Sequence, residues 1–290
     1  MIYDQESSSI HPETRVYNIS DSGSILVEKL YSNELLYNLA NDENKLLARI
    51  KVVYNLYNLD KKERLTDSLT TTFRFEKKSE VKYNMIEIPV KAKIGNNYIL
   101  EVITIDQNRN KNQYSFIKIE RTKRVNQQDF IISDTSNNEF IVESVFNSSR
   151  HFTVDHYKFN FDSLNVYFFC KDDKVPLPPY ENDSLNYNFT FSDTTWVCYL
   201  DSIKYENFAN EGVYYFTNEN SPENGFAMKQ FGDDFPKVRT PEKLIKPLAY
   251  LGLQDTISMS DSTGKFTKLT IDNFWLKKTH NIDKSRDLLK

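Results

Sequence analysis

The chain has 290 residues, enough for two or three domains, and its 39% hydrophobic and 27% charged residues fit a folded protein rather than a disordered one. A net charge of -4 without a sustained basic stripe argues against nucleic-acid binding, and the densest basic spot, residues 121–124, is more typical of a strand end or linker. No stretch reaches the roughly 20 apolar residues of a membrane-spanning helix, and the first residues show no signal-peptide pattern.

The first part of the chain has the pattern of β-strands. Residues 1–24 are polar and predict an extended arm. Apolar and polar residues then alternate with a period of two, most clearly at residues 46–56 and 86–94, and residues 95–97 (Gly-Asn-Asn) signal a hairpin turn. Short strands of this kind predict an immunoglobulin-like or fibronectin-like β-sandwich over residues 25–122.

The second part repeats the β pattern and then changes. Short apolar segments predict another β-sandwich over residues 123–234. Thr240-Pro241 is typical of a helix start, and the apolar spacing after it predicts helices in residues 235–290. The predicted fold is therefore mainly β, with two immunoglobulin-like or fibronectin-like sandwich domains followed by a short α-helical C-terminal segment.

One predicted loop, residues 106–112, resembles a cation-binding site. Residues 106–112 place Asp or Asn oxygens at alternate positions, like the start of a calcium loop. However, Lys111 and Ile117 stand where an EF-hand needs Gly and Glu. A polar hairpin loop is therefore predicted instead, and no catalytic residue, cofactor or metal ligand is assigned anywhere in the chain.

The histidines and cysteines carry no clear chemistry either. In a strand, His151 and Asp155 face one way and His156 the other, which argues against a shared metal site. Cys170 and Cys198 each lie in an apolar, strand-like run. Both a disulfide between neighbouring strands and two buried free thiols fit this pattern.

A short pattern occurs more often than composition explains. Asp followed by Ser or Thr and then by an apolar residue or Thr occurs seven times, where roughly one or two instances are expected. The pattern resembles the O-glycosylation sequon of exported Bacteroidetes proteins, and the alternative is a common turn-to-strand junction. The candidate hydroxyls are Ser68, Ser163, Ser184, Thr194, Ser202, Thr256 and Ser262.

Six stretches carry a family resemblance: residues 9–17, 106–110, 176–180, 234–250, 272–278 and 283–289. They resemble the GWxTD-domain proteins of Bacteroidetes. The motif that names the family, Gly-Trp-any-Thr-Asp, is absent and is expected downstream of Lys290. The resemblance implies an exported cell-envelope protein, often a lipoprotein, whose lipid-attachment Cys would lie before Met1, and it implies that residues 235–290 are the start of a truncated GWxTD domain.

The preferred functional hypothesis is a non-enzymatic scaffold or docking subunit of a periplasmic or outer-membrane-associated complex. Its partners would be other envelope proteins, with no nucleic acid, and it would reach the membrane only through the lipid anchor. Phe274 and Trp275 are the candidate interface, since their broad apolar arc would face the missing part of the domain.

Two alternatives stay open. Aromatic-rich β-sandwiches often stack sugars, so the chain is also a candidate glycan-binding protein, with Tyr180, Tyr187 and Tyr214 as candidate stacking residues. The third hypothesis is a scaffold for an enzyme whose site lies in the missing C-terminal domain.

Overall fold

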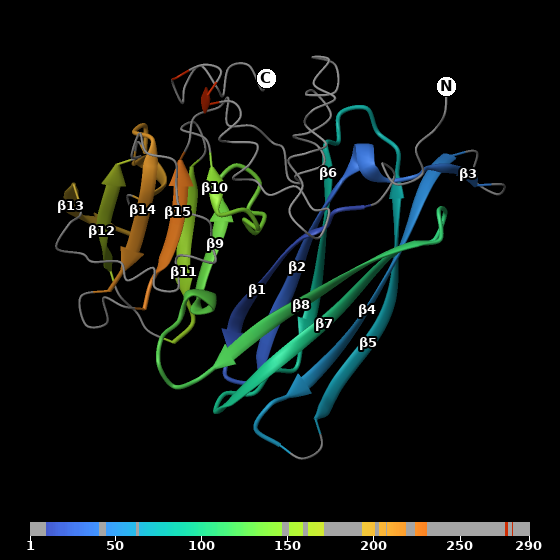
Figure 1. The fold of residues 1–290 in the computed structure, drawn as a ribbon, viewed down its shortest axis with the longest axis horizontal. Helices are drawn as coiled ribbons and strands as arrows, with labels where there is room; N and C mark the ends of the chain where they lie inside the picture. The colour runs from blue at the N-terminus through green and yellow to red at the C-terminus, as the bar shows by residue number, and fades with distance from the viewer. Residues whose placement is uncertain are drawn as a thin grey trace.

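The computed structural model describes residues 10–40, 45–61, 64–146, 151–158, 162–170, 193–200, 203–206, 208–218 and 224–230, together with Leu276, Lys277 and His280. This part of the chain is mainly β, as predicted, and it forms two lobes (Figure 1). The predicted helical segment, residues 235–290, lies outside the described residues except for Leu276 and Lys277, which are helical, and His280. Within the described ranges, no helix is long and apolar enough to cross a membrane.

The first lobe contains two packed antiparallel sheets. The central sheet has the order β1-β2-β6, with bounds Glu13–Ser20, Gly23–Tyr31 and Tyr83–Val90. The outer sheet has the order β3-β4-β7-β8, and β5 pairs with the other edge of β4. Its strands are β3 (Asn38–Ala40), β4 (Lys45–Asn58), β5 (Leu65–Glu76), β7 (Asn96–Asp106) and β8 (Lys111–Arg121).

The second lobe is built from shorter strands. Its larger sheet has the order β10-β15-β14-β12-β13, with bounds Val145–Phe146, Phe226–Gln230, Gly212–Thr217, Ser163–Cys170 and Thr194–Tyr199. Its smaller sheet pairs β9 (Phe130–Asp134) with β11 (Phe152–His156). Short 3-10 helices lie in the connections between strands, at Ser32–Glu34, Gln127–Asp129 and Ile203–Tyr205.

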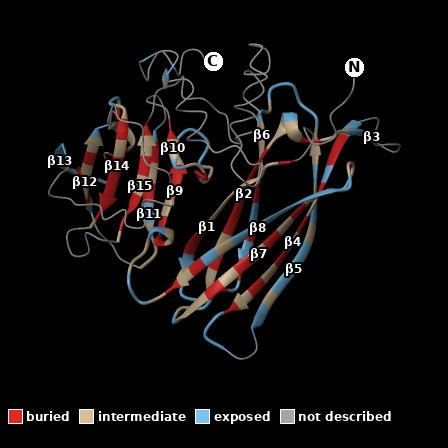
Figure 2. Cartoon of the chain, in the orientation of Figure 1, coloured by how far each residue is buried: buried red, intermediate tan, exposed pale blue. Residues whose placement is uncertain are grey.

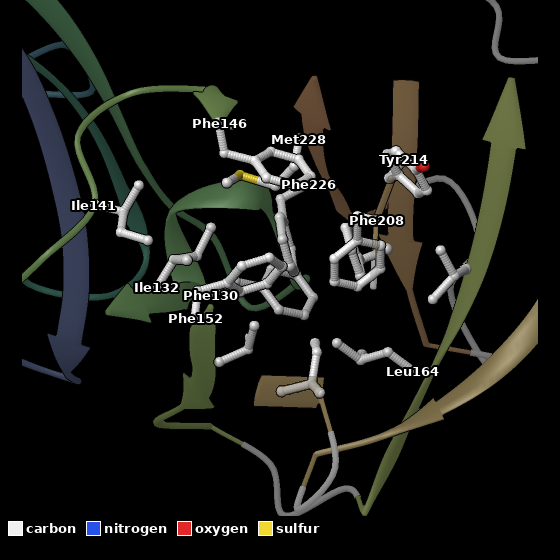
Figure 3. Close-up of a cluster of buried hydrophobic side chains, with 14 of the residues drawn as sticks. Phe130, Ile132, Ile141, Phe146, Phe152, Leu164, Phe208, Tyr214, Phe226 and Met228 are labelled. Carbon is white, nitrogen blue, oxygen red and sulfur yellow. The ribbon is translucent and has the colours of Figure 1, made fainter. Parts of the chain in front are cut away.

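The two lobes have different cores. In the first lobe, alternate residues of β4 from Ala48 to Leu56 point inward and pack against aliphatic side chains of the central sheet. In the second lobe, aromatic rings dominate, and Phe130, Phe152 and Phe226 converge on one cluster (Figure 3). The first core therefore follows the period-two pattern of its strands, whereas the second is a cluster of rings.

The central sheet contributes to both cores. In β2, Leu26 faces the aliphatic core and its neighbour Val27 faces the aromatic core, because successive strand residues point to opposite faces. In β1, Val16 and Tyr17 divide in the same way. The Tyr17 hydroxyl also donates a hydrogen bond to the carbonyl of Ile141 in the second lobe. The lobes thus share a layer and are not simply joined by a linker.

The N-terminal residues differ from the prediction. The sequence predicts an extended arm over residues 1–24, but residues 13–20 form β1, which pairs along its length with β2. Most residues of β1 are polar, so the sequence lacks the apolar alternation that indicates a strand. Hydrogen bonds to β2 and a few buried side chains, such as Tyr17, hold it in the sheet.

Candidate interaction surface

The outward face of the outer sheet is a regular array of side chains, because four long strands pair in register. Three rows cross β5, β4, β7 and β8 in that order: Thr72, Lys51, Ile105 and Asn112; Thr70, Val53, Ile103 and Tyr114; and Ser68, Asn55, Glu101 and Phe116. We call these residues the outward array. The intervening residues of β4 and β7 point into the aliphatic core, so the array is the opposite face of the same sheet.

The centre of the array is apolar, and the exposure of its side chains increases toward β8. Val53, Ile103 and Ile105 are partly buried by their neighbours. Tyr114 is 50% exposed and Phe116 is 67% exposed. Figure 2 shows exposed residues along β5 and the first part of β8, on either side of the more buried β4 and β7. Two large aromatic side chains on one exposed edge are typical of a protein-contact surface.

The edge of β8 is open over a short segment. In this strand, the even-numbered residues direct their backbone groups away from β7, as the side chain of Gln128 demonstrates. Gln128 accepts a hydrogen bond from the Glu120 N–H at 2.9 Å and donates one to the Lys118 carbonyl at 2.9 Å. The side chain of Gln128 thus covers the last part of the edge, whereas no described residue outside β8 hydrogen-bonds to the backbone edge of Asn112–Phe116, which we call the open segment. Within that segment, the side-chain hydrogen bonds of the described structure are local, from Gln113 to the Tyr114 carbonyl at 3.3 Å and from Asn112 to the Tyr114 hydroxyl at 3.2 Å.

The charged side chains on this face differ in sign between the two ends of the array. Arg49 and Arg74 lie opposite each other beyond one end of it, next to the row that contains Lys51. Glu101, in the third row, accepts a hydrogen bond from Asn55 at 2.8 Å. The face is therefore basic near the start of β4 and contains a carboxylate farther along, with apolar residues between them.

The candidate glycosylation hydroxyls fall in two settings. Ser163 and Thr194 are the first residues of β12 and β13. This position fits the alternative hypothesis, in which the pattern marks a turn-to-strand junction. Ser68 lies inside β5, is exposed and belongs to the outward array. Its neighbour Asp67 points inward and accepts a hydrogen bond from Tyr54 at 2.8 Å. O-glycosylation at all of these residues stays a prediction.

Several predicted site residues lie outside the described residues. They are Ser184, Ser202, Thr256 and Ser262 among the candidate glycosylation sites, Phe274 and Trp275 of the candidate interface, and Tyr180 and Tyr187 of the candidate sugar platform. Tyr214, the third member of that platform, is buried in the aromatic core, and its ring lies 4.8 Å from the ring of Phe168. It therefore has no face available for stacking a sugar.

The loop that resembles a calcium site has a structural explanation. Asp106 is fully buried and accepts hydrogen bonds from the backbone N–H groups of Leu36 and Asn108, at 3.2 Å and 3.0 Å. The amide of Asn108 donates to the carbonyls of Leu36 and Leu47, at 2.7 Å and 2.9 Å. These side chains close the β7–β8 hairpin and attach it to β4 and to the segment before β3.

The basic spot at residues 121–124 is part of the joint between the lobes. Arg121 is fully buried, and its guanidinium donates to the carbonyls of Ala92 and Ser20 and to the Tyr157 hydroxyl. Nearby, buried Asp129 accepts hydrogen bonds from Asn18 and Lys158, both at 2.8 Å. A linker or strand end was the predicted explanation for this basic spot, and the structure adds that its first residue is a buried clamp between the lobes.

The histidines show no metal site in the described part of the chain. His151 precedes β11, Asp155 is exposed, and His156 packs edge-on against Phe130 with its ring centroid 5.0 Å away. Burial lowers the pKa of His156 to about 4. Among the described residues, no group of three or more His, Cys, Asp or Glu side chains is arranged to hold an ion.

The cysteines are not bridged. Cys170 is exposed at the end of β12 and Cys198 is buried in β13, and both are free thiols. Leu164, not Cys170, is the residue opposite Cys198 in the β12–β13 pair, which places the two thiols too far apart along the strands for a disulfide. Burial raises the pKa of Cys198 to about 12, so its thiol is unreactive at neutral pH.

One acidic side chain is enclosed in the aliphatic core. Glu28 in β2 is fully buried and accepts a hydrogen bond from the Thr104 hydroxyl at 2.9 Å. Its second oxygen has no hydrogen-bond partner in the described structure. Burial raises the pKa of this carboxyl to about 7, and the Thr104 hydrogen bond partly opposes the rise. A closed core gives this group no substrate to act on, so we treat it as a determinant of stability.

The sequence prediction missed the outward array, although one signal was present. Residues 98–105 in β7 form a nearly continuous apolar run, with Ile99, Ile103 and Ile105 on the face opposite the core. Strands that are apolar on both faces are typically covered on both faces. In this sheet the second face carries exposed residues, including Tyr114 and Phe116.

Comparisons with known proteins match only part of the chain. Residues 212–290 match the family model of the GWxTD domain. The match begins 23 residues before the predicted start of that domain at residue 235, and so includes β14 and β15. No curated protein matches the chain.

Solved structures add little. One that matches is beta-glucuronidase 2 of Bacteroides uniformis, covalently bound to cyclophellitol-6-carboxylate aziridine. It is 11% identical to this chain, with a TM-score of 0.24 over 56% of this chain and 16% of that one. A likeness at this level supports no conclusion about fold or activity.

Proposed function

We propose that this chain, a GWxTD-domain protein by its match over residues 212–290, is a non-enzymatic docking module that binds other proteins through its outward array. The observation that carries the proposal is the exposure of Tyr114 and Phe116 beside the apolar centre of the array and the open edge of β8. Aromatic anchors surrounded by polar groups are the usual source of binding energy in protein interfaces.

The joint between the lobes supports a scaffold role. Lys29 on the central sheet pairs with Glu143 of the second lobe, and its ammonium lies 4.0 Å from the ring centroid of Tyr83. The Tyr83 hydroxyl in turn donates to Glu139 at 3.0 Å. Contacts of this kind, added to the shared core, fix the direction in which the array points relative to the second lobe.

The proposal puts the protein in the cell envelope, as a subunit of a periplasmic or outer-membrane-associated complex. Its support is the resemblance of the C-terminal sequence to exported GWxTD-domain proteins of Bacteroidetes, together with the family match. A lipid anchor upstream of Met1 belongs to the same proposal, and intact mass of the protein isolated from its cells tests it.

Capture from a solubilised envelope fraction tests the docking function. The test variant carries Tyr114→Glu and Phe116→Glu, which place charge on the exposed aromatic positions. The matched control carries Tyr199→Glu, because Tyr199 is 61% exposed on β13 in the other lobe. We expect the proteins captured by the wild type and by the control to be lost from the double variant. Identical capture by all three would refute docking through the array.

A further inference from the structure

We propose that the strand which pairs with the open edge of β8 is β8 of a second copy of this chain, antiparallel and centred on Tyr114. The two outer sheets would then join into one continuous sheet across a two-fold axis. This inference rests on the proposed function, since it names a partner for the same surface.

The open backbone groups match this pairing. Asn112, Tyr114 and Phe116 direct their N–H and C=O groups away from β7. Centred on Tyr114, the pairing puts Asn112 opposite Phe116 of the second copy and Tyr114 opposite its own equivalent. Each of these residues can then exchange both backbone hydrogen bonds with its partner. The Tyr114 carbonyl already accepts a hydrogen bond from Gln113 at 3.3 Å, and its second lone pair accepts the bond from the other copy.

Features at both ends of the segment set the register. A shift of the pairing toward the end of β8 requires the edge between Lys118 and Glu120, which the Gln128 side chain covers through its bonds to both residues. A shift the other way brings in Asn110, which has a left-handed φ of 56° and belongs to the hairpin turn. The register centred on Tyr114 avoids both obstacles.

Charge selects the antiparallel arrangement. The segment from Asn112 to Ile117 is uncharged and is bounded by Lys111 and Lys118. A parallel, in-register pair would place each lysine beside its equivalent, and like charges directly opposite each other are destabilising. In the antiparallel pair, Lys111 faces Ile117 and Lys118 faces Asn110 of the second copy, so no lysine faces another.

The side chains also continue across the axis. The middle row of the array ends with Val53, Ile103 and Tyr114. Antiparallel pairing places Tyr114 beside Tyr114 of the second copy, and the apolar row then runs on into its Ile103 and Val53. Aromatic pairs directly across a sheet are among the favourable cross-strand neighbours.

Sedimentation equilibrium of the full chain tests the inference. We expect a concentration-dependent dimer for the wild type, and loss of the dimer in Tyr114→Lys, which sets two ammonium groups against each other at the axis. Thr70→Lys is the matched control, because Thr70 lies in the same row on the opposite edge, and it should dimerise like the wild type. A wild type that stays monomeric up to about 1 mM would overturn the self-pairing.

Disulfide trapping tests the register. Cys170 is exposed and is first replaced by Ser, so that it does not cross-link. In that background, Tyr114→Cys should form an intermolecular disulfide on mild oxidation, since hydrogen-bonded antiparallel residues have Cα atoms about 5.5 Å apart. Thr70→Cys should remain uncross-linked. Equal cross-linking of the two variants would indicate random collision and contradict the register.

The two proposals fail separately. If the wild type is monomeric and Tyr114→Cys does not cross-link, self-pairing is wrong, whatever the capture experiment shows. If the chain dimerises as expected but the double glutamate variant captures the same envelope proteins as the wild type, docking of other proteins through the array is wrong and self-association stands. Far-UV circular dichroism of each variant confirms that its strands have formed.

Discussion

The two lobes obtain their cores in different ways. The first lobe stacks long strands, of which β4 has 14 residues, and fills the space between its sheets with aliphatic side chains. The second lobe has strands of eight residues or fewer in its described part and packs aromatic rings against one another. Regular alternation along the strands thus builds the first core, whereas the second depends on a few large side chains and their geometry.

The largest expected effect breaks the aromatic core. The ring of Phe216 stacks on Phe226 with centroids 4.8 Å apart and meets Phe152 edge-on at 5.8 Å. Phe216→Ala removes these contacts and leaves a cavity, which should cost about 3–5 kcal/mol in the free energy of unfolding. Urea denaturation followed by circular dichroism measures the loss. Ile50→Val in the aliphatic core is the comparison, expected to cost about 1 kcal/mol, and equal losses would contradict the difference between the cores.

The buried carboxyl of the first core gives the next largest effect. Glu28 has its pKa raised to about 7 in the folded protein, against 4.5 for the ordinary side chain. Between these values the folded state holds a proton that the unfolded state has released, so stability is present at low pH and falls as pH rises from 4.5 to 7. Removing the carboxyl by Glu28→Gln should abolish a fall of about 3 kcal/mol. Unfolding free energies from pH 4 to pH 8 test this, and an unchanged slope in the variant would contradict it.

A smaller effect is expected where the lobes meet. Tyr17→Phe keeps the ring in the aromatic core but removes the hydroxyl that donates to the carbonyl of Ile141. The loss of this buried hydrogen bond should cost about 1–2 kcal/mol. Hydrogen exchange should also rise in β9 and around residue 141 more than in β4 or β7. A uniform rise over both lobes would show that this bond does not act locally at the joint.

The second lobe should show a pH dependence of opposite sign, and a smaller one because His156 is only partly buried and solvent screens its charge. Burial lowers the pKa of His156 to about 4, below its ordinary value of 6.5. The unfolded state therefore takes up a proton first as pH falls, and the stability contributed by neutral His156 is lost as pH decreases from 6.5 toward 4. His156→Gln should flatten that part of the stability profile. The measurement is the same pH series used for Glu28→Gln, and a steeper acid loss in the variant would contradict the expectation.

The sequence predicted the strands better than their arrangement. Period-two alternation in β4, from Ala48 to Leu56, is a local property, and the mainly β fold inferred from such segments is confirmed. The pairing of β1 with β2 is a local hairpin, but the second face of these strands depends on contacts with residues more than a hundred positions away, such as that of Tyr17 with Ile141. Local pattern contains no information on which core each face will meet, so the shared layer was not predicted.

The candidate site was predicted less well than the fold. The sequence favoured a polar hairpin for residues 106–112, and the bonds of Asp106 give that loop a structural role. It did not identify Tyr114 or Phe116, because an exposed aromatic in a strand has the same pattern as a buried one. Tyr214 shows the converse, since an aromatic chosen as a surface platform lies in a core.

Because β2 contributes side chains to both cores, it tolerates few changes in length. Inserting one residue within β2 would exchange the faces of Leu26 and Val27 beyond the insertion point and misdirect side chains in both cores at once. The same insertion in β5, which forms an edge and turns Ser68 and Thr70 to solvent, would disturb one margin of one sheet. Length variation among related chains should therefore gather in the hairpins around β5 and be excluded from β2.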